Sequence, residues 1–272
     1  MIGLQHIGMF TTVDEAPDPG LLIGLLDRMQ DAPDVQRIRA EALDALALQP
    51  GERVLDIGCG TGDHTREMAG LVAGDGEAVG VDFSHAMITE ASRRQQGSGQ
   101  PATFEQGDAQ GLRFEAETFD ACRSERMLCH VPDCRQALAE MVRVTRPGGR
   151  VAVIDADTGG VLIDSPNRAL TEEFASSLTG TIQHPWIGRQ LRRLFVEAGL
   201  VAVDVRPLVI EVGFGVVEPM IDAHVAGLLA AGSADPAAVE QWRRELEYAN
   251  LAGTFFMAMT MVLAIGRKPG PS

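Results

Sequence analysis

Three glycines that follow a carboxylate form the part of the chain best suited to chemistry. Gly58, Gly60 and Gly62 alternate with other residues just after Asp56, and a short apolar run precedes them. The pattern predicts a buried strand, a glycine-rich turn and then a helix over Thr65 to Val72. Glycine lets the backbone bend sharply and approach a ligand closely, and the N–H groups at a helix start favour an anion. Asp56 adds a negative charge, so the turn suits a ligand with both signs of charge, such as the zwitterionic end of an amino acid.

The spacing of these glycines does not match a dinucleotide-binding turn. In the G-x-G-x-x-G pattern, a start at Gly58 would put the third glycine at Asp63, and a start at Gly60 would put it at Thr65. A carboxylate at that position would lie poorly beside phosphates. A nicotinamide-dependent oxidoreductase is therefore the disfavoured alternative, and binding of NAD would reveal it.

Two further acids follow predicted strands. The run Ala78–Ser84 is predicted to be a second strand, and its Asp82 lies about 20 residues after the glycines, as ribose recognition by a carboxylate requires. No Arg or Lys follows directly to bind a 2′-phosphate. A third strand around Thr103 leads to the pair Asp108-Ala109. The second strand therefore predicts a site for a ribose with free hydroxyls.

The D-x-G-x-G-x-G turn resembles motif I of the class I S-adenosylmethionine (SAM) dependent methyltransferases. The resemblance extends from Gln36 to Asp155, because Phe119–Ser124 matches that family's fourth strand and Arg146–Asp155 its next turn and fifth strand. The pattern is most similar to the branch with the ubiquinone and menaquinone C-methyltransferases and many small-molecule N- and O-methyltransferases. The resemblance implies an α/β fold with SAM as cofactor: a Rossmann-like, seven-stranded, mostly parallel sheet with an antiparallel seventh strand, helices on both faces and helical cap insertions.

The same resemblance assigns residues to the cofactor. Asp82 would accept the ribose hydroxyls, Asp108 would take the exocyclic amine of the adenine, and the backbone N–H of Ala109 would meet its ring. Met87 would pack on the adenine, and Ser124 would contact the methionine portion through its backbone. The complete implied set is Asp56, Gly58, Gly60, Gly62, Asp82, Phe83, Met87, Asp108, Ala109 and Ser124, with no metal ligand.

Methyl transfer from a sulfonium is an in-line displacement that can rest on positioning and desolvation. It needs a general base only if the nucleophile carries a proton. His130, just after the fourth strand, is the candidate catalytic residue, because histidine titrates near neutral pH. Its alternative role is packing or hydrogen bonding at the start of the next helix. His64, which follows the glycine turn, is expected to border the cofactor.

Other polar residues near these motifs have two interpretations each. Asp155 and Asp157 end the fifth strand, and they could orient an amine or hydroxyl or be solvated turn acids. Arg37 or Arg39 could reach the cofactor carboxylate or lie on a solvated helix face. His184 could line the pocket or lie in a surface loop.

The remaining pattern extends this core in both directions. Asp133 and Gln136 form a D-x-x-Q pattern like a capping box, at the start of a helix that Pro147-Gly148-Gly149 ends. Further helices are predicted at 21–29, 35–47, 168–178, 187–198, 221–231 and 237–248, and strands at 201–212 and 255–267. The predicted units are an N-terminal helical cover (1–50), the SAM-binding core (51–157), a cap segment (158–185), continued core (186–217), a second cap segment (218–253), and a final core strand with tail (254–272). The cap segments leave the ligand edge of the sheet and should fold over the site, although plain packing on the sheet is the alternative.

The composition narrows the class of partner. A net charge of −15 over 272 residues argues against nucleic acid and against an anionic membrane surface, because both need a basic face. The four cysteines show no C-x-x-C pair and are expected to be reduced. No secretory signal is evident, and the most apolar run, Phe255 to Ile265, is too short to span a bilayer, so we expect a cytoplasmic protein.

The sequence therefore predicts a SAM-dependent methyltransferase that acts on the N, O or C atom of a small molecule, with a possible homodimer. The alternative is a methyltransferase-fold protein that binds SAM but catalyses a non-methylating reaction such as cyclisation.

Overall fold

The computed structural model describes residues 12–96, 99 and 101–270, so residues 1–11 of the predicted N-terminal cover lie outside the described residues. Within these residues the strands form one seven-stranded sheet of order β3-β2-β1-β4-β5-β7-β6. The strands are β1 (Arg53–Ile57), β2 (Glu77–Asp82), β3 (Ala102–Gln106), β4 (Phe119–Glu125), β5 (Thr145–Ile163), β6 (Val201–Glu211) and β7 (Met257–Arg267). Strands β1 to β5 pair in parallel, whereas β7 is antiparallel to both β5 and β6. The predicted Rossmann-like sheet with an antiparallel seventh strand is confirmed.

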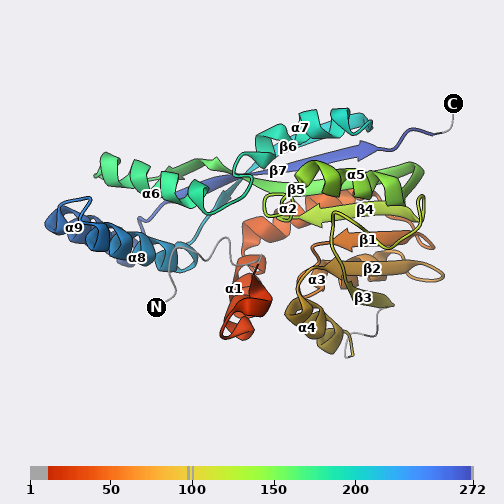
Figure 1. Cartoon of the computed structure of the whole chain (residues 1–272), viewed down its shortest axis with the longest axis horizontal. Helices are drawn as coiled ribbons and strands as arrows, with labels where there is room; N and C mark the ends of the chain where they lie inside the picture. The colour runs from red at the N-terminus through yellow and green to blue at the C-terminus, as the bar shows by residue number, and fades with distance from the viewer. Residues whose placement is uncertain (1–11, 97–98, 100, 271–272) are drawn as a thin grey trace.

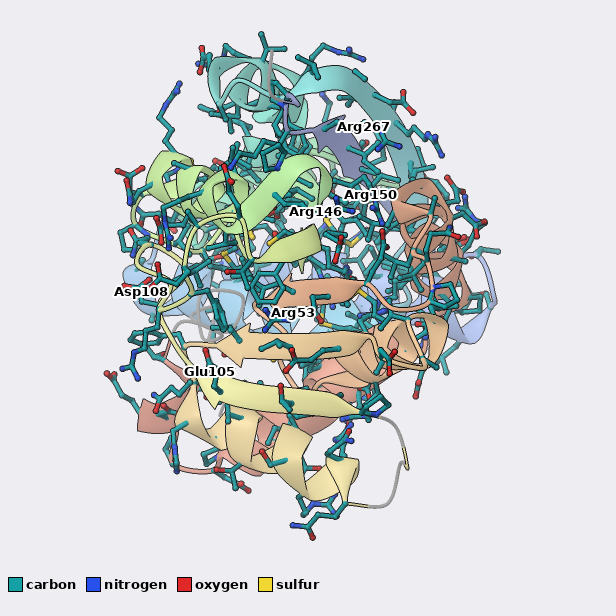
Figure 2. The ribbon with its side chains drawn as sticks, turned by 90° about the vertical axis from the view of Figure 1, so that its right-hand side faces the viewer. Arg53, Glu105, Asp108, Arg146, Arg150 and Arg267 are labelled. Carbon is teal, nitrogen blue, oxygen red and sulfur yellow. The ribbon has the colours of Figure 1, made fainter. Side chains whose placement is uncertain are left out.

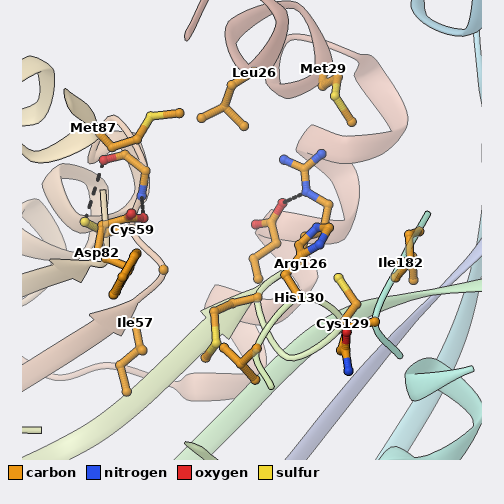
Figure 3. A pocket seen from close by; sticks show the side chains of 18 of the residues that line it. Leu26, Met29, Ile57, Cys59, Asp82, Met87, Arg126, Cys129, His130 and Ile182 are labelled. Atoms are coloured by element: carbon orange, nitrogen blue, oxygen red, sulfur yellow. Dashed lines mark hydrogen bonds and ion pairs between the residues drawn. The ribbon is translucent and has the colours of Figure 1, made fainter. Parts of the chain in front are cut away.

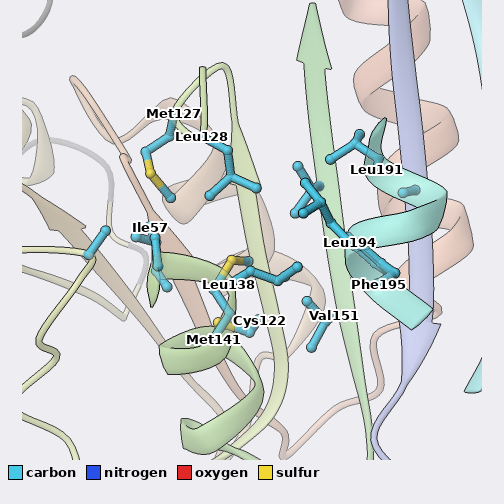
Figure 4. Close-up of a cluster of buried hydrophobic side chains, with 14 of the residues drawn as sticks. Ile57, Cys122, Met127, Leu128, Leu138, Met141, Val151, Leu191, Leu194 and Phe195 are labelled. Carbon is cyan, nitrogen blue, oxygen red and sulfur yellow. The ribbon is translucent and has the colours of Figure 1, made fainter. Parts of the chain in front are cut away.

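Helices cover both faces of this sheet (Figure 1). They are the 3-10 helix η3 (Val13–Glu15), α1 (Pro19–Gln30), α2 (Pro33–Leu46), α3 (Asp63–Leu71), α4 (His85–Gln95), α5 (Cys134–Val144), α6 (Arg168–Gly180), α7 (Ile187–Glu197), α8 (Phe214–Ala231) and α9 (Pro236–Leu251). Val54 of β1 belongs to a core with α2 and α3, whereas its neighbour Leu55 belongs to a core with α5 and α7. Figure 4 shows the second of these cores, where Leu138 of α5 and Leu194 of α7 lie over the sheet. Because β1 is buried on both faces, its sequence is a nearly continuous apolar run.

The amino ends of the parallel strands are closed by arginine contacts. Figure 2 labels four arginines that stand on β1, β5 and β7 at this end: Arg53, Arg146, Arg150 and Arg267. Arg150 donates to both carboxylate oxygens of Glu52, at 2.7 and 2.5 Å, and its Nε–H donates to the carbonyl of Leu46. These bonds tie the end of α2 to the sheet, so the opposite, carboxyl edge is the one left for a ligand.

The segments beyond the sheet form a cap with its own hydrophobic core. We define the cap as α6, α8, α9 and the adjoining ends of β5 and β7, which lie together in Figure 1. Trp242 of α9 is fully buried there, 5.7 Å from the ring of Phe174, and its Nε1–H donates to Thr171 Oγ1 at 3.1 Å. The first residues of the predicted cap segment 158–185 instead continue β5 as far as Ile163, which pairs with Met257.

The start of α5 corrects one local prediction. Asp133 caps the helix, because its Oδ1 accepts the N–H groups of Arg135 and Gln136. The reciprocal bond of a capping box is absent between these two residues, since the Gln136 side chain donates to the carbonyl of Gln110 and the Asp133 N–H donates to the Gln110 side chain. The helix also ends at Val144, before the predicted Pro-Gly-Gly stop. Asp133 and Gln136 therefore bind the loop after β3, through Gln110, as well as starting the helix.

Helix α8 is strongly apolar, as is the predicted final strand. Within the described residues it is the one helix whose length and composition would allow it to cross a membrane, whereas the predicted run from residue 255 to 265 lies largely in β7. Part of α8 is packed in the cap core, where Val217, Ile221 and Leu228 are buried. Its apolar composition thus has a role inside the fold, and the absence of membrane binding stays a prediction.

Candidate active site

A cavity of about 760 Å³ lies at the carboxyl edge of the sheet. Its wall runs from the ends of β1 and β2, past the loop after β4, to the cap, and α1 lies across it. Figure 3 shows Asp82 and Met87 on one side, Arg126 and His130 in the middle and Ile182 on the other side. The cavity therefore joins the glycine motif to the cap in one space.

The glycine turn forms one wall through bare backbone. Gly58 and Gly60 have φ values of +72° and +53°, in the left-handed region that favours glycine. The Gly58 N–H donates to the carbonyl of Val81 at 2.8 Å, and the Gly60 N–H donates to Oδ2 of Asp82 at 2.8 Å. A Cβ added at Gly58 would lie 2.8 Å from the Cβ of Met127. The turn is thus held against the end of β2, and a side chain at Gly58 would force Met127 to move.

Not every predicted contact residue lines this cavity. Those that do are Asp56, Gly58, Gly60, Asp82, Phe83, Met87, Asp108, Ala109 and His130. Gly62 and Ser124 are not among the lining residues. Gly62 is the N-cap of α3 with φ of +80°, and a Cβ there would collide with the ring of Phe104. Its role in this structure is to start the helix, and Ser124 is buried within β4.

The two motif acids are held differently. Asp82 accepts N–H bonds from Gly60 and Ser84, and burial raises the pKa of its carboxyl while these two bonds oppose the rise. Each of its oxygens keeps a second lone pair for a hydroxyl donor. Asp56 is buried, and its carboxylate accepts from Thr65 Oγ1 at 2.9 Å and from Arg123 Nη1 at 3.2 Å. Its negative charge is therefore already compensated by a cation from β4.

A buried charge cluster forms part of the cavity wall, and the sequence did not predict it. It consists of Asp56, Arg39, Arg123, Glu125 and Arg126, all of which line the cavity. Glu125 accepts three hydrogen bonds from Arg39, at 3.1 to 3.2 Å, and one from Arg123 at 2.8 Å. Burial disfavours the ionised Glu125, but the charges of Arg39, Arg126 and Arg123 outweigh burial and hold the pKa of this carboxyl well below its usual range. Three guanidiniums thus share two carboxylates.

The two candidate arginines of α2 differ in burial and in their partners. Arg39 enters the cluster, whereas Arg37 is half-exposed and pairs with Asp34 and Glu41 on the helix surface. His64 lines the cavity, with Nε2 3.8 Å from Glu125, and burial lowers its pKa. Its place beside the cofactor stays a prediction.

His130 lines the cavity, and its imidazole is uncharged at neutral pH. Burial, with a smaller contribution from the charge of Arg126, lowers its pKa to about 4. At neutral pH its imidazole is therefore uncharged and a weak base, because its conjugate acid gives up the proton readily. The structure brings His130 to the predicted place but reduces its power to remove a proton.

The strand-end acids of β5 are both buried, so the interpretation as solvated turn acids is wrong. Asp155 accepts the N–H of Cys129 at 3.1 Å, and burial raises the pKa of its carboxyl to about 6. Asp157 accepts from Arg189 at 2.5 and 2.6 Å. His184 is not among the cavity residues, and its Nε2 lies 3.0 Å from the carbonyl of Val131. All four cysteines are free.

The cap side of the cavity has a different chemistry. We call it the chamber: its wall is supplied by the far end of β5, the loop after α6, and α8 and β7. Representative lining residues are Val161, Leu178, Ile182, Val217, Met220 and Met257. Among the described residues from these elements, those that line the chamber are apolar or are the neutral Thr158, Thr181 and Gln183. The charged half and the chamber meet at Arg126 and His130.

Known proteins resemble this chain in sequence and in fold. A model of the methyltransferase domain matches residues 54–149. A 37.1 kDa protein in transposon TN4556 of Streptomyces fradiae is 32% identical over 90% of this chain and 71% of its own length. The demethylmenaquinone methyltransferase of Bacillus cytotoxicus is 30% identical over 62% of this chain and 78% of its own. Phosphoethanolamine N-methyltransferase 2 of Haemonchus contortus, solved with phosphomonomethylethanolamine and S-adenosylhomocysteine (SAH), shares the fold, with a TM-score of 0.60, 18% identity, and coverage of 92% of this chain and 57% of that one.

These matches agree with the sheet order, the glycine turn and the acid at the end of β2. The chain belongs to the class I methyltransferases and is an enzyme that uses S-adenosylmethionine as its cofactor.

Proposed function

We propose that this enzyme transfers the methyl group of SAM to a small molecule with a largely apolar body. The observation that carries the proposal is the continuity of the cavity, which joins the glycine turn and Asp82 to the apolar chamber. A methyl group presented between these two halves would face an acceptor enclosed by the cap. The chamber would also exclude water, and a desolvated site strengthens the interactions that position the reactants.

The polar half fits SAM in the chemistry of its donors and acceptors. Asp82 offers fixed acceptors for the ribose hydroxyls, and Asp108 and Ala109 lie where the adenine edge would be read. Phe83, 67% exposed, and the buried Met87 offer apolar surface to the adenine. The glycine turn, together with Asp56, Arg39 and Arg123 of the buried charge cluster, would hold the zwitterionic methionine end. When bound, SAM supplies an electrophilic methyl group, whose bond to sulfur breaks with both electrons remaining on sulfur as SAH.

Calorimetry on the whole chain tests the cofactor assignment. SAM and SAH should bind, and NAD should not, because the turn lacks the glycine spacing for a pyrophosphate. Tighter binding of NAD than of SAM would refute the proposal.

The Asp82→Ala variant tests the ribose site. Charge-assisted hydrogen bonds are worth about 1.5–3 kcal/mol each, so the variant should weaken SAH binding by at least about tenfold. Asp204→Ala is the matched control, since Asp204 is half-exposed on β6 and pairs with Arg206. An unchanged dissociation constant in a folded Asp82→Ala protein would remove Asp82 from the ribose site.

Product analysis separates the proposal from the non-methylating alternative. Incubation with SAM and a panel of apolar phenols, quinols and amines should release SAH in step with a product heavier by one CH₂. A converted acceptor without SAH would support the alternative, in which SAM is bound but not consumed.

A further inference from the structure

Arg126 lines the cavity where its charged half meets the chamber. It follows β4 directly and has a φ of +50°, a left-handed backbone that is costly for a residue other than glycine. Its N–H donates to the carbonyl of Ile154 at 2.8 Å, which holds the strained turn in place. In Figure 3 its side chain extends into the space below Leu26 and Met29, with His130 beside it. The backbone is thus bent in a way that presents this guanidinium where the two halves of the cavity meet.

The charge of Arg126 is the least compensated in the buried cluster. Its Nε lies 3.5 Å from Oε1 of Glu125, whereas Glu125 already accepts four hydrogen bonds from Arg39 and Arg123. Arg123 in turn shares Asp56. Glu67 beside His64 and the buried Asp155 add further negative charge around the three guanidiniums. Arg126 nevertheless has the weakest pairing with a lining carboxylate, so its guanidinium is the one that favours an anionic group in the cavity.

The surroundings on the chamber side offer Arg126 little negative charge. The groups whose charges interact with that of Arg126 are Arg39, Glu125, Cys129, His130 and Asp155. Of these, Asp155 is fully buried behind Cys129 and is not among the lining residues. A cationic amine in the chamber would therefore meet a guanidinium and no lining carboxylate from the described cap residues, whereas an oxyanion would meet its natural partner.

We infer that Arg126 binds the oxyanion of the acceptor, which identifies the acceptor class as an apolar molecule with one acidic hydroxyl, a phenol or an enol. This inference rests on the proposed function and assigns Arg126 as the residue that selects for hydroxyl acceptors over amines. The hydroxyl proton leaves to bulk water as the acceptor binds, and Arg126 stabilises the electron pair that remains on oxygen. That pair forms the new bond from oxygen to the methyl carbon as the bond from the methyl carbon to sulfur breaks. A general base is then unnecessary, in agreement with the weakly basic His130.

The spectrum of a bound probe measures the effect directly. The probe is 4-nitrophenol, whose anion absorbs visible light and whose neutral form does not. Its apparent pKa is measured bound to the protein with saturating SAH and also without it; SAH carries no sulfonium charge that could contribute. The expected result is a bound pKa about one unit below that of free 4-nitrophenol, a tenfold preference for the anion. In Arg126→Gln the shift should vanish, and in Arg126→Lys part of it should remain.

Control measurements separate the possible sources of the effect. Arg135→Gln removes the same charge from an exposed residue of α5 that pairs with Glu197, and it should leave the shift unchanged. Calorimetry should rank 4-nitrophenol above 4-nitroanisole, which has no hydroxyl, and above the cation of 4-nitrobenzylamine. SAH should bind wild-type and Arg126→Gln proteins within about twofold of each other.

Several outcomes would overturn the inference. An unshifted or raised pKa of bound 4-nitrophenol in the wild-type protein would do so, as would failure of the probe to bind. If Arg126→Gln weakened SAH binding tenfold and left the shift intact, the guanidinium would serve the cofactor carboxylate instead. Failure of SAH to bind the wild-type protein would count against the proposed function, and the probe measurement without SAH would still judge Arg126.

Discussion

Replacing Glu125 by Gln should destabilise the protein more than almost any other single polar substitution. The side chain of Glu125 is 8% exposed and accepts four hydrogen bonds from two guanidiniums. Gln keeps the shape but removes the charge, and Arg39, Arg123 and Arg126 are then left together with one carboxylate. Removing one partner of a buried ion pair costs about 3–5 kcal/mol, because the remaining charge stays desolvated without compensation.

This cost translates into a measurable shift of the melting temperature. Unfolding entropy is about 2.1 cal/mol/K per residue, or about 0.57 kcal/mol/K for 272 residues. A loss of about 3–5 kcal/mol therefore lowers the melting temperature by about 5–9 °C. Denaturant unfolding of the ligand-free protein, followed by circular dichroism, gives the free energy itself, and absence of ligand keeps cofactor binding from masking the change.

The pH dependence has a defined sign. The pKa of Glu125 is lower in the folded protein than in the unfolded chain, so its stabilisation is present above its unfolded pKa near 4.5 and is lost as the pH falls toward the folded value. The difference in unfolding free energy between wild type and Glu125→Gln should therefore be constant near neutral pH and shrink below about pH 4.5.

A double-mutant cycle with Arg39→Gln tests whether the cluster acts as a unit. The double variant removes both a carboxylate and its main partner, so its destabilisation should fall short of the sum of the single variants by at least about 1 kcal/mol. Additive costs, or a loss below about 1 kcal/mol for Glu125→Gln alone, would refute the picture of a desolvated and coupled cluster.

Three further predictions concern other parts of the structure. Folding lowers the pKa of His130 to about 4, so below about pH 6.5 the unfolded chain binds a proton at this residue that the folded protein does not, and the free energy of unfolding falls. His130→Asn should therefore reduce the loss of stability measured between pH 7 and pH 5. Gly62→Ala should lower the free energy of unfolding by about 1 kcal/mol or more beyond the loss caused by Gly74→Ala, as measured by denaturant unfolding. Both glycines have a positive φ, but only at Gly62 would the added Cβ collide with a ring, that of Phe104. Equal losses for the two variants would contradict this. Amide exchange in α6, α8 and α9 should be faster than in β1 and β2 in the free enzyme and slow down when SAH and an acceptor bind; indifference to both ligands would make the cap a rigid packing element.

The glycine turn and the acid after the second strand were predictable because their signals are local. A left-handed turn against a strand end requires glycine, so the turn at Gly58 and Gly60 can be recognised in the sequence. Asp82 lies at the end of the next strand along the chain. Parallel strands with both faces buried need continuous apolar runs, which made the strands of the sheet recognisable, whereas the antiparallel direction of the last strand came from the family resemblance.

The charge cluster and the chamber could not be predicted in the same way. Arg39 and Glu125 are 86 residues apart, and a charged residue on a helix or at a strand end reads as solvent-exposed until packing removes the water around it. Arg126 follows a strand like many other residues, and its direction depends on a strained φ that no sequence pattern announces. The chamber needs apolar side chains from β5, α6, α8 and β7 to converge, so its shape, and with it the preference for an acceptor, arises only when distant segments pack together.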